Sequence, residues 1–275
     1  MQRMKLSVLS DNHAAGAEYD SEWGLCFALG HSDGGLWLWD TGASDKFLSN
    51  AWRLGIDIGR AQGLMISHGH YDHSGGIASL LEQTDFRGPV YGHSDIFLQR
   101  YSVRGGKAKS IGMDVAALSR DLPGFRPVNG IRQIAPGLIM ASSITRRPGL
   151  CQAVDGFYLD PHAEHPDAVY DDACLVMEAG PVRALILGCC HSGLGNTMTH
   201  LREELGYDSF SHVIGGMHLY SEDRTPLDEA VAFLREFDVD YVRPCHCTGD
   251  KASRVLSDAL PGRVEPLGAG RVFEL

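Results

Sequence analysis

The chain has 275 residues, with 24 Lys and Arg against 35 Asp and Glu, and its formal net charge is −11. At about 150 residues per domain, this length allows one large domain or two small ones. The acidic balance argues against nonspecific binding to nucleic acid or to an anionic membrane surface, so we expect neither partner. No stretch approaches the about 20 apolar residues of a membrane span. The N-terminus predicts a β-strand rather than a signal peptide, so we expect a cytoplasmic protein.

Short strands separated by Gly and Asp turns are predicted in the first third of the chain. The strands at 25–30 and 36–39 are expected to form a hairpin through residues 31–35. In chain order, the sequence predicts strands at 5–9, 25–30 and 36–39, a helix at 47–54, a strand at 64–67, a helix at 77–83 and a strand at 90–91.

Residues from about 94 to 150 are less regular and richer in Arg, Gly and Pro. No linker composition marks the edges of this segment, so it is predicted to be an inserted lobe or lid of a single 1–275 domain. Strands alternating with helices in both halves predict an α/β layered sandwich, two sheets faced by helices. The second half contains predicted strands at 173–178 and 183–187, a helix at 198–205, a strand at 212–214, a helix at 227–237 and a strand at 241–243.

The most informative segment is a His-x-His-x-Asp-His motif that directly follows an apolar strand. On a strand-to-helix loop, residues two apart can turn the same way, so His68 and His70 can bind one metal ion. Asp72 and His73, further round the loop, can face a second ion. Imidazole and carboxylate ligands suit Zn²⁺, and also Mn²⁺ or Fe²⁺. The motif therefore predicts a metal centre, with two zinc ions as the expected content.

This segment resembles the signature of the metallo-β-lactamase superfamily, whose fold is a four-layer αβ/βα sandwich with a metal centre at one edge of its sheets. Leu38-Trp39-Asp40-Thr41-Gly42 resembles the first motif of that family. By this resemblance Asp40 orients the metal ligands, and the alternative is an ordinary turn at a strand end. The family has further ligands at downstream strand ends, which implies His191 and His246 here.

The second half departs from the common family pattern at the bridging ligand. Family members commonly carry an Asp after a Gly, whereas Gly188 is followed here by Cys189. Cys189 either supplies a thiolate or is a small buried residue. His162 and His165 are alternative replacements for the missing ligand, or else loop histidines.

Seven cysteines are scattered along the chain, and we expect them to be reduced thiols. Two groups flank histidines, namely Cys189-Cys190 and Cys245-His246-Cys247. Neither group has a zinc-finger or iron–sulfur spacing, which uses two separated Cys-x-x-Cys-like pairs.

A narrower resemblance covers most of the chain. It implicates the branch of the superfamily that contains the archaeal methanopterin-pathway enzyme 7,8-dihydropterin-6-methyl-4-(β-D-ribofuranosyl)aminobenzene 5′-phosphate synthase. Many members of this branch are presumed hydrolases, so the resemblance defines the site more closely than the substrate. The segments that carry it are Ser10–Asn12, Gly188–Gly193, Ile214–Leu219 and Cys245–Gly249.

Polar residues at two other strand ends are also candidates. His218 follows two glycines at the end of an apolar strand, so its side chain is expected at the same edge as His191 and His246. It either contacts the substrate or packs as a strand-end histidine. Asp11 and Asn12 end the first strand and either face the site or cap a turn.

Several residues are candidates for binding an anionic group of the substrate. They are His93 with Arg100 and Tyr101, and the Arg146-Arg147 pair on the predicted lid. A solvated helix face gives the same spacing as the first group. The chain contains no nucleophilic serine elbow, phosphate-cradling glycine loop or dinucleotide fingerprint.

These features together predict a metal-dependent hydrolase in which a metal-bound hydroxide attacks an ester, amide or phosphoester-type bond. The expected substrate is a small molecule, and an anionic one would be met by the metal cations. Asp72 and His218 are the predicted catalytic side chains. The alternatives are a transferase that resembles the dihydropterin synthase, and a metal- or ligand-binding sensor without turnover. The predicted metal ligands are His68, His70, Asp72, His73, His191 and His246.

Overall fold

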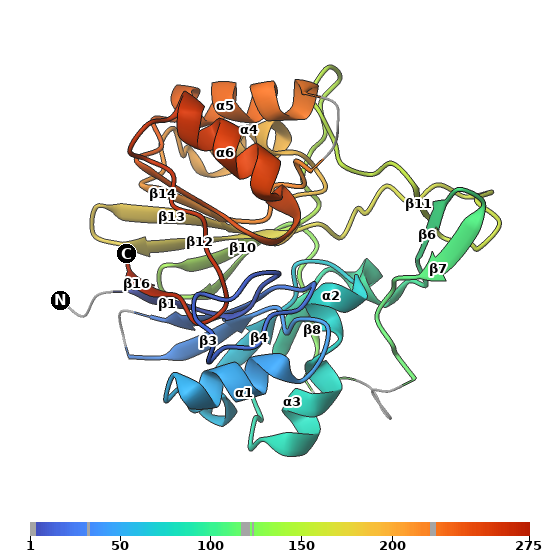
Figure 1. Ribbon diagram of the computed structural model, residues 1–275, viewed down its shortest axis with the longest axis vertical. Helices are drawn as coiled ribbons and strands as arrows, with labels where there is room; N and C mark the ends of the chain where they lie inside the picture. Colours follow the sequence, from blue (N-terminus) through green and yellow to red (C-terminus); the bar gives the residue numbers. More distant parts are fainter. Residues whose placement is uncertain (1–3, 32–33, 117–121, 123, 221–223) are drawn as a thin grey trace. The chain divides into compact units, whose positions relative to one another are not determined.

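The computed structural model describes residues 4–31, 34–116, 122, 124–220 and 224–275, and the chain folds into two compact units (Figure 1). The first unit comprises Met1–Asn129, Val154–Asp171 and Gly268–Leu275, and the second comprises Gly130–Ala153 and Asp172–Leu267. The segment predicted as an inserted lobe is thus divided between the units at residue 129. One domain with an inserted lobe stays a prediction.

The first unit is built on a seven-stranded sheet with the strand order β16-β1-β2-β3-β4-β5-β8. The strands from β3 to β8 are parallel, so their carboxyl ends share one edge of the sheet, whereas β16, β1, β2 and β3 are antiparallel neighbours. The strands are β1 (Lys5–Ser10), β2 (Cys26–Gly30), β3 (Leu36–Trp39), β4 (Gly63–Met65), β5 (Val90–Gly92), β8 (Arg126–Pro127) and β16 (Val272–Glu274).

Helices α1 and α3 cover one face of this sheet (Figure 1). Phe47 of α1 and Leu80 of α3 are fully buried in the same apolar cluster as Leu38 and Leu64 of the strands. The burial of these side chains holds the helices on the sheet. The helical segments of this unit are α1 (Lys46–Arg53), η1 (Ile58–Arg60), α2 (Tyr71–Ser74), α3 (Ile77–Gln83) and η2 (Ser94–Phe97).

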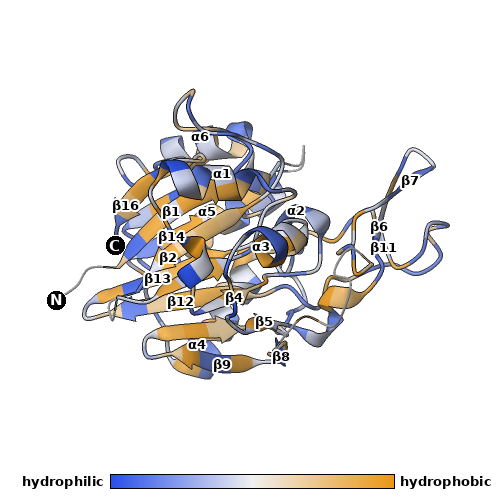
Figure 2. Cartoon of the chain, turned by 90° about the horizontal axis from the view of Figure 1, so that it is seen from below, coloured by the Kyte–Doolittle hydropathy of each residue, from blue (hydrophilic) through white to orange (hydrophobic). Residues whose placement is uncertain are grey.

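A three-stranded sheet projects from the seven-stranded sheet in the first unit, with the order β11-β6-β7 (Figure 1). Its strands are β6 (Tyr101–Arg104), β7 (Lys107–Ser110) and β11 (Phe157–Tyr158). Its outer strand β7 is exposed and hydrophilic, in contrast to the mostly hydrophobic strands of the large sheets (Figure 2). At its base, the N–H of Tyr71 donates to the carbonyl of Ile111 at 2.8 Å. The projecting sheet is thereby joined to the start of α2.

The second unit is built on a six-stranded sheet with the order β15-β14-β13-β12-β10-β9. Strands β13, β14 and β15 are parallel neighbours, so their carboxyl ends lie side by side. The elements are β9 (Ile131–Ala135), β10 (Leu138–Ala141), β12 (Cys174–Ala179), β13 (Val182–Leu187), α4 (Leu194–Leu205), β14 (His212–Gly215), α5 (Thr225–Glu236), β15 (Tyr241–Pro244), η3 (His246–Thr248) and α6 (Asp250–Ala259).

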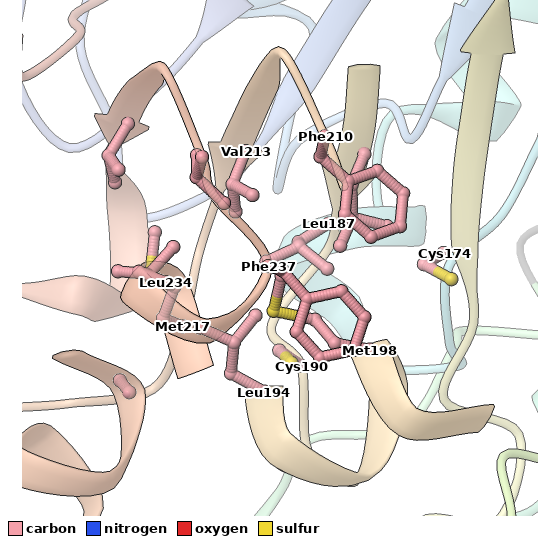
Figure 3. Packing of buried hydrophobic residues seen from close by; sticks show 14 of the residues in the cluster. Cys174, Leu187, Cys190, Leu194, Met198, Phe210, Val213, Met217, Leu234 and Phe237 are labelled. Carbon is pink, nitrogen blue, oxygen red and sulfur yellow. The ribbon is translucent and has the colours of Figure 1, made fainter. Parts of the chain in front are cut away.

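Helices α4, α5 and α6 pack on this sheet through one apolar cluster. Figure 3 shows Met198 of α4 and Phe237, which follows α5, among side chains of the strands, such as Leu187 and Val213. Cys190 lies in the same cluster. No helix in the described part of the chain is both long and apolar enough to cross a membrane.

The predicted elements of the sheets are confirmed, including the β2–β3 hairpin and the α/β class. Helix α4 begins at Leu194, four residues before the predicted start, because Gly193 has a φ of 87° and its carbonyl accepts the N–H of Thr197. The sequence did not predict α2, α6, β16 or the strands between residues 101 and 158. Of these, β8, β11 and β16 are short strands whose pairing partners are distant in the sequence.

Candidate metal centre

The first unit carries the four side chains of the His-x-His-x-Asp-His motif. They follow β4, with His68 and His70 on the loop and with Asp72 and His73 on α2. All four are buried. A ring nitrogen of His73 lies within 4.8 Å of a ring nitrogen of His68 and also within 4.8 Å of a carboxylate oxygen of Asp72. Nε2 of His68 is 3.0 Å from Nδ1 of His70. The short spacing of the motif therefore brings these four side chains close together.

A buried carboxylate organises two of the histidines. The Oδ2 atom of Asp40 accepts a 2.8 Å bond from the Ser67 hydroxyl and lies 2.7 Å from Nδ1 of His73. Its Oδ1 atom accepts the backbone N–H of Ser67 at 2.7 Å. The Ser67 hydroxyl oxygen is in turn 2.9 Å from Nδ1 of His68. Asp40 thus reaches His73 directly and His68 through Ser67, which is the orienting role that the family resemblance implies.

This network determines which ring nitrogens can bind a metal. A carboxylate only accepts hydrogen bonds, so Nδ1 of His73 carries the proton and Nε2 keeps its lone pair. The Ser67 hydroxyl gives its proton to Asp40 and therefore accepts from Nδ1 of His68, which leaves Nε2 of His68 as the second lone-pair nitrogen. Neutral imidazoles with fixed tautomers, beside a carboxylate, are a donor set that fits Zn²⁺.

Asp40 occupies a conformation that is uncommon for residues other than glycine, with a φ of 59°. It follows β3, and its N–H donates to the carbonyl of Met65 at the end of β4 at 2.9 Å. Asp is among the side chains that tolerate this left-handed region. The conformation therefore belongs to a turn that aims the carboxylate at the loop after β4.

The loop between His68 and His70 is held from a second side. Its Gly69 N–H donates to Oδ2 of Asp171 at 2.7 Å, and Oδ1 of Asp171 pairs with Arg100 at 2.8 Å. Arg100 also pairs with Asp167 at 3.1 Å, and its side chain is only 1% exposed. The alternative in which Arg100 binds an anionic substrate is therefore wrong, because its charge is buried and is met by two carboxylates. Arg100 instead positions the loop.

In the second unit, the other three histidines predicted for the site lie at the carboxyl ends of β13, β14 and β15. His191 follows β13, His218 follows β14 and His246 begins η3 after β15. The rings of His191 and His218 have centroids 4.7 Å apart. Nδ1 of His191 donates to the carbonyl of Ala153 at 2.6 Å, so the neutral ring keeps its lone pair on Nε2. His191 thus resembles His68 and His73 in having a fixed tautomer.

Two cysteines join His218 at these strand ends. One ligand atom from each of Cys189, His218 and Cys247 lies within 4.8 Å of the other two. Burial favours a higher pKa for the Cys247 thiol. Hydrogen bonds with Cys189 and His218 and the charges of His246 and His218 outweigh this effect and hold its pKa well below the usual range. Cys189 is buried, which agrees with the alternative that it is a small buried residue. Its sulfur also lies within 4.8 Å of a ligand atom of His218 and of Cys247.

Three of the eight non-glycine residues with left-handed backbone in the described part of the chain lie at the same strand ends. His218 has a φ of 51°, His246 a φ of 49° and Cys190 a φ of 57°. Residues other than glycine adopt this region rarely, and such conformations are found preferentially at functional sites. The backbone therefore supports a functional role for this edge independently of the residue types.

Other candidate residues have structural contacts. His162 and His165 are exposed in a loop whose N–H groups donate to Asp160, so neither has the surroundings of a buried ligand. Asp11 and Asn12 accept the N–H groups of His13 and Gly24, which agrees with the turn-capping alternative. Nδ1 of His93 accepts the N–H of Asp95 and caps η2. Arg147 is paired with Glu203.

Sequence reasoning missed Ser67 and the Arg100–Asp171 pair, and it noted Cys247 beside His246 without giving it a role. Ser67 immediately precedes the motif, and its position after an apolar strand was an available signal. Cys247 follows the last strand by the same number of residues as His218 follows β14. Because parallel strands end at one edge of a sheet, that correspondence was a second signal. We find no local signal for the Arg100–Asp171 pair.

Comparison with known proteins bears on the fold and the site. The family model for the Metallo-beta-lactamase superfamily matches residues 24–138, which include Asp40 and the His68–His73 segment. The chain is 23% identical to the Methanocaldococcus jannaschii 7,8-dihydropterin-6-methyl-4-(beta-D-ribofuranosyl)-aminobenzene-5′-phosphate synthase, over all of this chain and 97% of that protein.

Two solved structures show the same fold. Tm1679, a metal-dependent hydrolase of the β-lactamase superfamily, is 28% identical with a TM-score of 0.85 over 99% of each chain. Zn²⁺-bound PqqB from Methylobacterium extorquens is 11% identical with a TM-score of 0.60, over 98% of this chain and 100% of that one. The second likeness is one of fold alone. These structures confirm the predicted fold class.

Proposed function

We propose that this chain, a member of the metallo-β-lactamase superfamily, is a metal-dependent hydrolase of an ester, amide or phosphoester-type small molecule. The observation that carries the proposal is the buried Asp40 carboxylate, 2.7 Å from Nδ1 of His73 and 2.8 Å from the Ser67 hydroxyl. Such a carboxylate is used to fix metal-binding histidines and is otherwise expensive to bury. The likeness to Tm1679, described as a metal-dependent hydrolase, supports the same reaction class.

Four of the residues proposed to hold metal lie in the first unit and two lie in the second. Zn²⁺ is the leading ion, with Mn²⁺ and Fe²⁺ as the alternatives, and two ions are proposed. When bound, such ions lower the pKa of a coordinated water and polarise a carbonyl or phosphoryl oxygen. The proposed ligands are His68, His70, Asp72, His73, His191 and His246.

The chain's own side chains have separate tasks in this proposal. Asp40 keeps the proton of His73 on Nδ1, and Ala153 does the same for His191 through its carbonyl. Asp72, buried beside His73, accepts a hydrogen bond from the attacking water and so orients it. His218 contacts the substrate through a ring N–H.

Arg146 is the proposed contact for an anionic substrate. It is half-buried, and its Nη2 atom is 3.4 Å from the hydroxyl of Ser192, next to His191 in the chain. Its Nη1 atom is 3.1 Å from Oε1 of Gln152. A guanidinium presents donors in a planar fork that suits a carboxylate or phosphate. Arg147, paired with Glu203, is not part of this contact.

The test combines metal content with activity. The purified protein is analysed for metals and then assayed on ester, amide, lactam and phosphodiester substrates after each metal is restored. We expect stoichiometric metal and hydrolysis in the wild type, and loss of both in His68→Ala/His70→Ala. His165→Ala, whose side chain is 71% exposed, is the matched histidine control and is expected to retain both. Wild-type protein that binds no metal contradicts the proposal, and metal binding without turnover favours a sensor.

A second candidate is a transferase that resembles the dihydropterin synthase. The observation in its favour is the 23% identity to that enzyme, which extends over the whole chain. It predicts formation of a pterin product when purified protein is supplied with the phosphorylated aminobenzene riboside and a dihydropterin whose 6-methylene carbon carries a leaving group such as diphosphate, which is released. Hydrolysis of simple esters together with no pterin product would exclude it.

A further inference from the structure

The segment that follows β14 alternates between the apolar cluster and the edge of the sheet. Met217, labelled in Figure 3, and Leu219 are buried in the cluster that packs α4, α5 and α6 on the strands. His218 and Tyr220 instead contact each other, with ring centroids 4.8 Å apart. One pair of side chains therefore anchors the segment in the core and leaves the other pair at the surface of the second unit.

Three rings form a row at this edge, and it leads from the interior to the solvent. The centroids of His191 and His218 are 4.7 Å apart, and those of His218 and Tyr220 are 4.8 Å apart. His191 is fully buried, His218 is partly buried, and Tyr220 is 42% exposed. A small molecule that contacts His218 therefore lies next to the ring of Tyr220.

Tyr220 is exposed, but its position is fixed by the residues around it. The N–H of Met217 donates to the hydroxyl of Thr248 at 3.1 Å, which ties the segment to η3. Gly249 packs directly against the base of the tyrosine, since a Cβ added there would lie 3.1 Å from Cβ of Tyr220. An aromatic side chain on a fixed backbone loses little conformational freedom when a ligand binds to it. Tyr220 is therefore preorganised for binding.

Tyr241 shows which part of this arrangement is distinctive. It is the other exposed large hydrophobic side chain in the described part of the second unit, and it also stacks on a histidine, His212, with centroids 5.0 Å apart. Tyr241 and His212 are paired at the amino ends of β15 and β14, at the opposite edge of the sheet from His218. Single exposed aromatic side chains are common on protein surfaces. The distinctive feature of Tyr220 is therefore its place beside His218, and Tyr241 is a matched control.

We propose that Tyr220 determines substrate specificity by stacking on a planar aromatic ring of the substrate. Aromatic pairs in offset or edge-to-face contact gain binding energy beyond the area that they bury, which a saturated group of the same size does not. The substrate class is thereby narrowed to aryl esters, aryl amides and aryl phosphoesters. This inference rests on the proposed function, because it takes His218 as a substrate contact. With the anion contact proposed for Arg146, an aromatic phosphate or carboxylate fits best.

Binding of two phosphonates that cannot be hydrolysed tests the contact without turnover. Phenylphosphonate and cyclohexylphosphonate are titrated by calorimetry into the full-length, metal-restored protein, and the ratio of their affinities is the measured quantity. We expect wild type and Tyr220→Phe to favour the phenyl compound about 3- to 10-fold. The ratio should fall to about 1 in Tyr220→Leu, which has no ring to stack, and Tyr241→Leu should keep the wild-type ratio. Circular dichroism checks that each variant is folded, and Tyr220→Ala replaces Tyr220→Leu if it is not.

The outcomes separate this inference from the hydrolase proposal. Wild type that does not favour phenylphosphonate, or that binds neither compound, overturns the role of Tyr220, as does a Tyr220→Leu ratio equal to that of wild type. Loss of the preference in Tyr220→Phe assigns the contact to the hydroxyl and overturns stacking. A phenyl preference in a protein that hydrolyses no substrate leaves the aromatic contact standing and sinks the hydrolase proposal.

Kinetics supply a second readout if the protein is active. Stacking on Tyr220 holds the substrate and its transition state equally, so the loss in Tyr220→Leu is expected as a higher KM for aryl phosphodiesters rather than a lower kcat. Hydrolysis of aryl and alkyl phosphodiesters with the same KM in wild type refutes the role of Tyr220 and leaves the hydrolase proposal intact.

Discussion

Asp40 and His73 are joined by a 2.7 Å contact between Oδ2 and Nδ1, and both side chains are completely buried. They are 33 residues apart in the sequence, one after β3 and the other on α2. Asp40 also accepts two bonds from Ser67, so its two oxygens serve three donors. One carboxylate therefore determines the orientation of the loop and of a candidate metal ligand.

Asp40→Asn is expected to lower metal affinity by about 10- to 100-fold, the usual effect of removing a carboxylate behind a histidine ligand. An amide has a single acceptor oxygen, so at least one of the donors of Ser67 or His73 loses its partner. Competition with a chromophoric chelator measures the affinity. Asp45→Asn, on an exposed carboxylate before α1, is the matched control. Equal affinities for the two variants would contradict the orienting role.

Gly69→Ala is expected to disrupt the loop between His68 and His70. A Cβ at this position would lie 2.1 Å from the carbonyl oxygen of Ile96, and backbone cannot yield as a flexible side chain does. Overpacking of this kind costs about 1–3 kcal/mol of unfolding free energy. We also expect weaker metal binding, because the N–H of Gly69 anchors the loop to Asp171. Urea unfolding and the chelator assay measure the two effects.

Gly206→Ala is the control for that substitution. Gly206 ends α4 with a φ of 71° and has no atom within 4 Å of an added Cβ, so only the backbone conformation opposes the new side chain. We expect a loss of about 1 kcal/mol and unchanged metal binding. If Gly69→Ala is no more harmful than Gly206→Ala, the close contact with Ile96 is not the reason for glycine in the motif.

The fold and half of the candidate site could be predicted from local patterns. Short apolar runs bounded by Gly and Asp turns identify β1 and the β2–β3 hairpin, because such runs are typical of strands that are buried on both faces. The His68–His73 segment is equally local, since its ligands are neighbours along six residues. The role of Asp40 in orienting the metal ligands could be predicted only through the family resemblance, because its partner His73 is 33 residues away.

The remaining features depend on contacts between distant residues. Asp171 reaches Gly69 across 102 residues, and Cys247 reaches Cys189 across 58. Such pairs follow from strand order and from the projecting sheet, and a single sequence carries no signal for either. Arg100 illustrates the consequence. Its charge suggests a surface or ligand-binding role, whereas two distant carboxylates make it a buried structural residue.

Arg100→Met is expected to destabilise the protein by about 3–5 kcal/mol, because it leaves the carboxylates of Asp167 and Asp171 buried without their cation. Urea unfolding followed by circular dichroism measures the loss. Arg147→Met removes an ion pair to Glu203, whose side chain is 55% exposed, and is expected to cost less than about 1 kcal/mol. Similar losses for the two variants would show that the Arg100 network does not stabilise the first unit.

His212 is expected to make the free energy of unfolding depend on pH, and a single substitution can isolate this contribution. Burial first, and the charge of Arg243 second, lower its pKa to about 4, whereas an unfolded histidine has a pKa of about 6.5. Between these values the unfolded chain binds a proton that the folded chain does not. The free energy of unfolding therefore rises with pH through this window, and the contribution of His212 is lost as the pH falls from about 6.5 to 4.

His212→Phe keeps an aromatic ring for the stack on Tyr241, whose centroid is 5.0 Å away, but it cannot take up a proton. We expect the slope of unfolding free energy against pH to fall, between pH 6.5 and 4, by up to about 1.4 kcal/mol per pH unit. Burial also lowers the pKa of His93 and His200, so an acid dependence persists and the difference from wild type is the measured quantity. His162→Phe, on an exposed loop, is expected to leave the slope unchanged. Parallel curves for wild type and His212→Phe would mean that folding does not exclude a proton from His212.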